Sequence, residues 1–174
     1  MCRGREGDCT AAVLEERLEM KAVVFSDSHG DTVAMREAVE REKPDQILHL
    51  GDLTGDAERL GIRFPQIPLE YVCGNCDGFC LAPAVRLLEL RGRRVLMMHG
   101  HTHRVKTGYG GAIAAARQAG ADILLFGHTH QAYAERLEDG LWVMNPGSCQ
   151  SWDRTTYGVI LLEKTDTLCY TVPV

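Results

Sequence analysis

The sequence lacks three features that would direct it to a membrane, to secretion or to nucleic acid. No apolar run approaches the roughly 18 residues that a membrane-spanning helix needs. Residues 1–20 lack the apolar central region of a signal peptide. No block of basic residues is present, and the formal net charge is −5, so little of the chain could neutralise nucleic-acid phosphates. These absences predict a cytoplasmic protein with no membrane partner, and they disfavour a nucleic-acid partner.

A second CxxC motif is also missing. One CxxC occurs within "CGNCDGFC" (Cys73, Cys76, Cys80), where it could be a redox motif or half of a zinc site. Without a second pair it cannot complete a tetrathiolate zinc site. Seven cysteines in a chain that shows no signal peptide predict reduced, intracellular thiols.

The chain shows no internal repeat, linker or low-complexity segment, which indicates one domain. Its 174 residues are enough to bury a core, and 45% hydrophobic and 25% charged residues are ordinary for a globular protein. Residues 11–20 could form a short amphipathic helix with Leu14 and Leu18 on one face. We favour the simpler interpretation that residues 1–19 are a dispensable extension and that residues 20–174 form the domain.

The pattern of apolar runs predicts an α/β fold. A strand over 21–25, a helix over 31–43 with Asp31 as N-cap, and strands over 46–50 and 69–73 give a parallel strand–helix–strand unit. Further strands are expected over 84–90, 93–98, 122–126, 132–145 (a hairpin turned at Asp139-Gly140), 156–163 and 168–172, with a helix over 111–120. The second half is expected to be mostly antiparallel. Together these elements predict two mixed β-sheets packed face to face, with helices on the outside.

Polar side chains follow five of the apolar runs. In open α/β sheets ligands bind beyond the carboxyl ends of the strands, so these side chains should meet at one edge. They comprise two aspartates, one asparagine and four histidines, which is enough for two ions that share a carboxylate. Mixed nitrogen and oxygen ligands suit Mn²⁺, Fe²⁺, Ni²⁺ or Zn²⁺ rather than Ca²⁺ or Mg²⁺. The predicted ligands are Asp27, His29, Asp52, Asn75, His99, His128 and His130.

The motifs "SDSHGD", "LGD", "GNCD", "HGH" and "GHTH", in this order, resemble the calcineurin-like metallophosphoesterases. They are most similar to the small, single-domain bacterial and archaeal phosphodiesterase branch, to which "NPGS" (145–148) also points, and the resemblance covers about residues 20–174. It implies a metal-dependent phosphodiesterase with two divalent transition-metal ions, manganese first and iron, nickel or zinc as alternatives. A hydroxide bridging the ions would attack a small phosphoester.

The same resemblance assigns the ligands to the two ions. Asp52 would bridge both. The first ion would be held by Asp27, His29, Asp52 and His130, and the second by Asp52, Asn75, His99 and His128.

Three residues are predicted to lie near the leaving group or the phosphate. Cys76 stands where much of the superfamily has a histidine that protonates the leaving group, so good leaving groups should be preferred. Asp77 could carry or orient a proton instead. His101 is interpreted either as a phosphate contact or as a side chain just behind the ligands.

Three further polar residues are expected to have structural or surface positions, although one of them could also contact the substrate. His49 is expected in the core and His103 in a surface loop, while Arg154 could contact a substrate phosphate or simply lie on the surface.

Two other functions are open at this point. A eukaryotic sorting-complex subunit shares the fold as a scaffold but has lost most metal-site histidines, whereas this chain keeps all seven predicted ligands. A thiol module built on "CGNC" would leave the histidines unexplained. A homo-oligomer is also left open.

Overall fold

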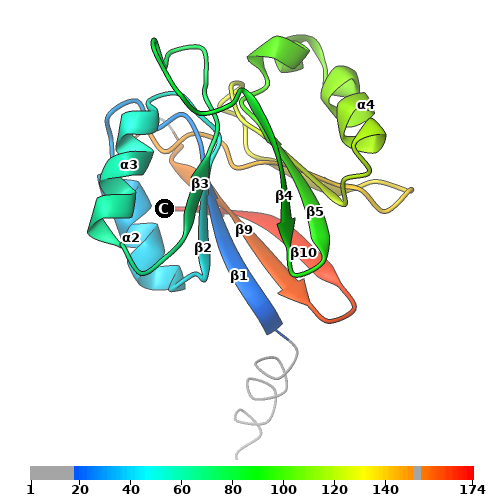
Figure 1. The fold of residues 1–174 in the computed structure, drawn as a ribbon, viewed down its shortest axis with the longest axis horizontal. Coiled ribbons are helices and arrows are strands. Elements are labelled where there is room, and N and C mark those ends of the chain that lie inside the picture. The colour runs from blue at the N-terminus through cyan, green and yellow to red at the C-terminus, as the bar shows by residue number, and fades with distance from the viewer. Residues whose placement is uncertain (1–17, 151–153) are drawn as a thin grey trace, which may run out of the picture.

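Two mixed five-stranded sheets face each other, with helices on both outer sides (Figure 1). This computed structural model describes residues 18–150 and 154–174. The predicted fold class, two mixed sheets packed face to face with helices outside, is therefore confirmed.

The first sheet has the order β10-β9-β1-β2-β3. Its parallel half pairs β1 with β2 and β2 with β3, as the strand–helix–strand pattern predicted. The last two strands of the chain complete it: β9 lies antiparallel to β1, and β10 lies antiparallel to β9. The bounds are β1 Leu18–Phe25, β2 Gln46–His49, β3 Leu69–Tyr71, β9 Thr156–Glu163 and β10 Thr167–Pro173.

The second sheet has the order β4-β5-β6-β8-β7 and is less antiparallel than expected. The pairs β5–β6 and β6–β8 are both parallel, and only β4–β5 and β7–β8 are hairpins. The helix between β5 and β6 makes the crossover that a parallel pair requires. The bounds are β4 Val85–Leu90, β5 Arg93–Met98, β6 Ile123–Phe126, β7 Tyr133–Arg136 and β8 Trp142–Asn145.

Three apolar clusters hold the layers together. Between the sheets, Ala22 and Val24 of β1 belong to the same cluster as Val95 and Met97 of β5. The alternate residues of β1, such as Phe25, turn to the other face and pack against the helices there. Because both faces of β1 are covered over residues 22–25, this part of the strand is a continuous apolar run rather than an alternating one.

Two helices cover the first sheet and one covers the second. Helices α2 (Val33–Glu42) and α3 (Thr54–Arg63) pack on the outer face of the first sheet, and α4 (Gly110–Gln118) packs on that of the second (Figure 1). The sequence analysis missed α3. Two short 3₁₀ turns, η1 (His101–His103) and η2 (Val105–Thr107), follow β5. Within the described parts of the chain, no helix is long and apolar enough to span a membrane.

The N-cap of α2 differs by one residue from the prediction. Thr32 occupies the cap position, and its side chain makes no capping hydrogen bond. Asp31 still satisfies the start of the helix, because the Val33 N–H donates to its carboxylate at 3.0 Å. The predicted helix end is confirmed for α4, where Gly120 follows the cap with φ +62°.

Strand β1 begins two residues before the predicted domain start, and Leu18 lies opposite Glu163 of β9. The division at residues 19 and 20 stays a prediction. We expect a chain that begins at Met20 to lose less than about 1 kcal/mol, so its melting temperature should fall by less than about 4 °C. Calorimetric unfolding measures this. A chain that begins at Ala22 also loses the buried Met20 and should melt clearly lower; equal losses in both would contradict the boundary.

Candidate metal centre

All seven predicted ligands lie at the carboxyl ends of five strands. Asp27 and His29 follow β1, Asp52 follows β2 and Asn75 follows β3, while His99 follows β5 and the pair His128 and His130 follows β6. The first three strands belong to one sheet and the last two to the other. The centre therefore lies where the carboxyl edges of the two facing sheets meet.

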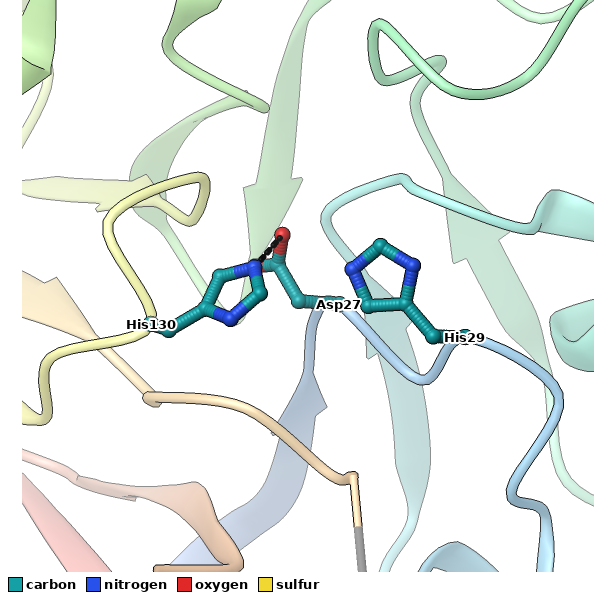
Figure 2. Close-up of side chains that lie close together, drawn as sticks. All are labelled: Asp27, His29 and His130. Atoms are coloured by element: carbon teal, nitrogen blue, oxygen red, sulfur yellow. Dashed lines mark ion pairs between the residues drawn. The ribbon is translucent and has the colours of Figure 1, made fainter. Parts of the chain in front are cut away.

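Asp27, His29 and His130 form the first group of side chains (Figure 2). The Nε2 atom of His130 lies 3.1 Å from Oδ1 of Asp27. One ligand atom from each of the three residues lies within 4.8 Å of those of the others. In Figure 2 the two imidazoles flank the Asp27 carboxylate from loops far apart in sequence.

Asp52, His99 and His128 form a second group, which Asn75 joins. The Nε2 atom of His99 lies 3.1 Å from Nδ1 of His128, 3.1 Å from Oδ1 of Asn75 and 3.4 Å from Oδ1 of Asp52. Nε2 of His99 thus lies within 3.4 Å of potential ligand atoms from three other strand ends.

The carboxylate of Asp52 links the two groups. Its Oδ1 faces His99, and its Oδ2 lies 3.9 Å from Nε2 of His29. The side chain is only 3% exposed. A buried carboxylate with one oxygen toward each group has the geometry of a ligand shared between two sites.

A third group consists of His29, Asp52 and Cys76, whose ligand atoms also lie within 4.8 Å of one another. The Cys76 N–H donates to Oδ1 of Asp52 at 2.9 Å. The exposed thiol thus stands at the rim of the centre. Its predicted place near the leaving group stays a prediction.

Five of the seven predicted ligands have a left-handed backbone conformation. The φ angles are +53° at Asp27, +45° at His29, +59° at Asp52, +68° at His128 and +57° at His130. A non-glycine residue in this region is strained by the order of 1–3 kcal/mol. Such strain persists only where the surroundings hold the loop. Here the strained residues are the ones whose side chains point into the candidate metal centre.

Two glycines let the ligand loops approach each other. A Cβ on Gly74 would collide with the backbone N and carboxylate of Asp52, and a Cβ on Gly127 would collide with the Ser26 hydroxyl and lie 2.8 Å from Oδ2 of Asp27. Neither glycine has a positive φ. Close approach, rather than backbone conformation, therefore accounts for glycine at these two positions.

Asp77 holds the loop after β2 to the loop after β3. Its Oδ2 accepts hydrogen bonds from the N–H groups of Asp52 (3.0 Å) and Gly74 (2.6 Å), and its Oδ1 accepts one from Thr54 (2.6 Å). The carboxylate is thus committed to backbone amides. In the structure Asp77 positions these two loops. A proton-carrying role for this residue stays a prediction.

Asp56 does the same for the loop after β1, a role that the sequence analysis missed because it did not expect α3. This buried residue in the first turn of α3 accepts hydrogen bonds from the Ser28 hydroxyl (2.9 Å) and the Gly30 N–H (2.7 Å). Ser28 and Gly30 flank His29, so Asp56 fixes the position of the His29 backbone from which the imidazole extends.

The "NPGS" segment holds the "GHTH" loop. The Asn145 amide donates to the Gly127 carbonyl at 3.1 Å and to the Thr129 hydroxyl at 2.9 Å, and the Ser148 hydroxyl donates to the Asp27 carbonyl at 2.9 Å. The motif that pointed to the family therefore positions ligands from two different loops.

Charges within the centre shift the pKa values of its groups. Burial opposes ionisation of Asp52, but hydrogen bonds from His99 and from the Cys76 N–H lower its pKa below the usual value. Burial likewise opposes ionisation of Asp27, whose pKa is lowered by the contact with His130 and by the charge of His99. Both carboxylates are therefore anionic and available to a cation.

The donor set fits a divalent transition metal. Nε2 of His29 is buried and has no hydrogen-bond partner among the described residues. Oδ1 of Asp27 is also buried, and its contact at 3.1 Å is with His130, another of the proposed ligands. Nδ1 of His99 lies 2.8 Å from the Leu50 carbonyl, which can only accept, so Nδ1 carries a proton in either charge state of the ring. A bound cation would take the place of the proton on Nε2, the nitrogen that faces Asp52 and Asn75. A backbone carbonyl behind a histidine is the usual arrangement for a metal ligand.

His49 lies in the core as predicted. It is fully buried beside Ser28, accepts a hydrogen bond from the Gly51 N–H at 3.2 Å, and burial lowers its pKa to about 4. His103 is half-buried in η1 rather than in an exposed loop.

His101 lies close to the centre. Its ring centroid is 5.5 Å from that of His99 and 6.2 Å from that of His128, and its buried Nδ1 has no hydrogen-bond partner within the described residues. Arg154 is exposed and lines a pocket beside His130. Phosphate contacts by both residues stay predictions.

The prediction of reduced thiols was wrong for one pair. Cys73 and Cys80 form a disulfide that closes the loop carrying Asn75 and Cys76. The turn after β3 brings their Cα atoms to 6.3 Å, within reach of such a bond. Cys76, Cys149 and Cys169 are free thiols, and Cys2 and Cys9 lie outside the described residues.

Comparison with known proteins identifies the family. The model of the calcineurin-like phosphoesterase superfamily domain matches residues 20–167. The chain belongs to this superfamily. It is 36% identical over 135 residues to YsnB of Bacillus subtilis, which is named a probable metallophosphoesterase; the match covers 74% of this chain and 75% of that relative.

Two solved structures share the fold. A conserved protein of Streptococcus pneumoniae, described as a predicted phosphoesterase, superposes with a TM-score of 0.73 at 24% identity over 88% of this chain and 89% of that one. Vacuolar Protein Sorting 29 of Cryptosporidium parvum gives 0.72 at 16% identity over 90% of this chain and 98% of that one. At these identities the likeness concerns the fold alone.

Gly127→Ala should disturb the centre. The added Cβ meets Ser26 and Asp27, so we expect a loss of about 1–3 kcal/mol in stability from overpacking and a lower content of bound metal. Thermal unfolding and metal analysis measure the two effects. Gly55→Ala is the matched control, because its Cβ meets nothing within 4 Å on exposed helix α3 and should change stability by less than about 1 kcal/mol. Equal behaviour of the two variants would refute the close-approach argument.

Proposed function

We propose that this phosphoesterase-superfamily protein is a phosphodiesterase that uses two divalent metal ions. The observation that carries the proposal is the position of Asp52, whose two carboxylate oxygens face two separate groups of ligand atoms. Asp27, His29, Asp52 and His130 would hold one ion; Asp52, Asn75, His99 and His128 would hold the other. Manganese is the first expectation, and iron, nickel or zinc are alternatives for the same nitrogen and oxygen ligands.

When bound, paired ions supply an activated water and neutralise the charge that gathers on phosphoryl oxygens. No side chain is then required as nucleophile. The chain's own task is to hold anionic and neutral ligands in fixed positions. Asp77, Asp56 and Asn145 do this through backbone hydrogen bonds, so the centre needs little rearrangement before a substrate binds.

A pocket beside the centre supports a small phosphoester as substrate. It has a volume of about 440 Å³, within the usual range for small-molecule sites, and is lined by His130, Gln131, Ala132, Arg154 and Thr156. His130 belongs to the first group of ligands, and Arg154 places a guanidinium in the same pocket. This supports the prediction that Arg154 contacts a phosphate oxygen.

Cys76 supports a preference for good leaving groups. The thiol stands at the rim of the centre, where burial together with the Asp52 carboxylate raises its pKa. A thiol of raised pKa is a weak donor to a departing alkoxide. Asp77, the alternative donor, uses both carboxylate oxygens for backbone amides.

The metal count tests the proposal directly. Loading with Mn²⁺ should give close to two ions per chain, because the seven proposed ligands divide into two sets that share Asp52. Asp52→Asn should weaken binding of both ions, whereas Asn75→Ala should weaken mainly one. Metal analysis with a titration of manganese measures both. His103→Ala, outside both groups, serves as the control; a maximum of one ion per wild-type chain would overturn the shared-carboxylate arrangement.

Leaving-group dependence tests the role of Cys76. A nitrophenyl diester should be hydrolysed much faster than an alkyl ester, since general-acid assistance is worth about 10²–10⁴-fold where it operates. Cys76→His should raise the rate on poorly activated esters and flatten this dependence. Rates against leaving-group pKa provide the measurement.

Cys76→Ser serves as the matched control for that experiment. The serine variant should keep both ions, because the thiol is not a ligand in this proposal. Loss of an ion in the serine variant would place Cys76 among the ligands, as the group of His29, Asp52 and Cys76 permits, and would contradict the proposed role.

A scaffold without turnover is the second candidate. The fold likeness to a Vacuolar Protein Sorting 29 protein favours it, whereas the complete set of seven convergent side chains favours catalysis. Metal-dependent hydrolysis of a phosphoester panel separates the two. A small phosphoester as the partner and a cytoplasmic location belong with the catalytic candidate and stay predictions.

A further inference from the structure

A pocket lies between α2 and α3, on the outer side of the first sheet. It has a volume of about 260 Å³ and is lined by Thr32, Arg36, Arg59, Leu60 and Arg63. The lining thus contains three guanidinium groups, one hydroxyl and no carboxylate. None of the seven predicted metal ligands takes part, and Figure 1 shows the two helices side by side on this face.

The helices present these residues in matched pairs. Thr32 and Arg36 are four residues apart at the start of α2, where the Arg36 N–H donates to the Thr32 carbonyl at 3.0 Å. Arg59 and Arg63 are four residues apart on α3. Residues at this spacing share one face of a helix, so each helix turns one such pair toward the pocket. Two arginines at this spacing repel each other by a few tenths of a kcal/mol, which a bound anion would offset.

The positive charge of the pocket is only partly neutralised. Arg59 pairs with the buried Asp56 at 2.9 Å. Among the described residues, the ion pair of Arg36 is with the adjacent Glu37 at 3.9 Å, and both side chains are nearly half exposed, so this pair is weak. Arg63 forms no ion pair with any carboxylate in residues 18–150 and 154–174. Two guanidiniums therefore remain available in a chain whose net charge is −5.

We infer that this pocket binds a phosphate group, either inorganic phosphate or the phosphate of a monoester. Guanidinium groups match phosphate oxygens in geometry and form charge-assisted hydrogen bonds with them. The Thr32 hydroxyl adds a neutral donor. The volume lies below the range usual for sites that enclose a whole small molecule, and it suits a phosphate group whose organic part, where present, extends into solvent.

The inferred phosphate site shares no residue with the proposed metal centre, so a test of one does not decide the other. Arg59 links it to the ligand loop, because its partner Asp56 also accepts the Ser28 and Gly30 hydrogen bonds. For this reason Arg59 is left intact in the test, and the variants are made at the two exposed arginines, Arg36 and Arg63.

The test titrates zinc-loaded, diamagnetic protein with inorganic phosphate and, separately, with a nucleoside monophosphate. Arginine side-chain signals in proton–nitrogen correlation spectra report binding at this pocket rather than at the metal centre. We expect saturable shifts of the Arg36 and Arg63 signals. Arg36→Gln and Arg63→Gln should each weaken the binding at least about tenfold, the loss of one charge-assisted hydrogen bond.

Arg91→Gln is the matched control. It removes the same charge from an exposed residue in the turn between β4 and β5, and it should leave the affinity unchanged. Tighter binding of one of the two probes identifies the source of the phosphate. The inference is overturned if no saturable shift occurs, if sodium chloride at equal ionic strength reproduces the shifts, or if the Arg36 and Arg63 variants bind as wild type does.

Discussion

The buried carboxylate of Asp52 is the group on which the rest of the centre depends. Removing a carboxylate from water is unfavourable unless it gains hydrogen bonds or opposite charge. Oδ1 of Asp52 accepts a hydrogen bond from the Cys76 N–H and lies 3.4 Å from Nε2 of His99. Its Oδ2 lies 3.9 Å from Nε2 of His29. Its own backbone N–H is held by Asp77. Four of the five ligand loops are therefore fixed in relation to this one residue or its neighbours.

The centre is organised mainly by hydrogen bonds between its loops and three polar side chains, of which Asp56 and Asn145 are buried and Asp77 is half-buried. Asp77, Asp56 and Asn145 each tie together loops that are distant in sequence. This explains how the left-handed conformations of the ligand residues can persist. Each left-handed conformation is unfavourable in isolation, but the hydrogen bonds of the neighbouring amides hold the loop in it.

Much of the fold followed from the sequence, and the reasons are physical. Continuous apolar runs such as residues 22–25 identify strands covered on both faces, and the order of strands and helices then restricts the topology. The polar side chains that end these runs must meet wherever the carboxyl edges meet. The convergence of these side chains therefore follows from the order of the apolar runs and the residues that end them.

Three features could not be predicted because they depend on contacts between distant segments. The helix α3 has only Ala57 and Leu60 as buried apolar residues, beside a buried Asp56, so its apolar stripe is too sparse to recognise. The parallel pairing of β6 with β8 depends on β7 taking the sheet edge. The disulfide between Cys73 and Cys80 depends on how sharply the chain turns after β3.

The distribution of strain and charge separates what the fold requires from what the site requires. The two sheets are held to each other by an apolar cluster that contains no carboxylate, so their packing alone demands no buried carboxylates. Here Asp27 and Asp52 are nearly inaccessible, and both carboxylates face imidazoles. A scaffold would gain stability by replacing such groups with apolar ones. Their retention, together with the left-handed backbone that aims them inward, is best explained by a cation that these side chains bind.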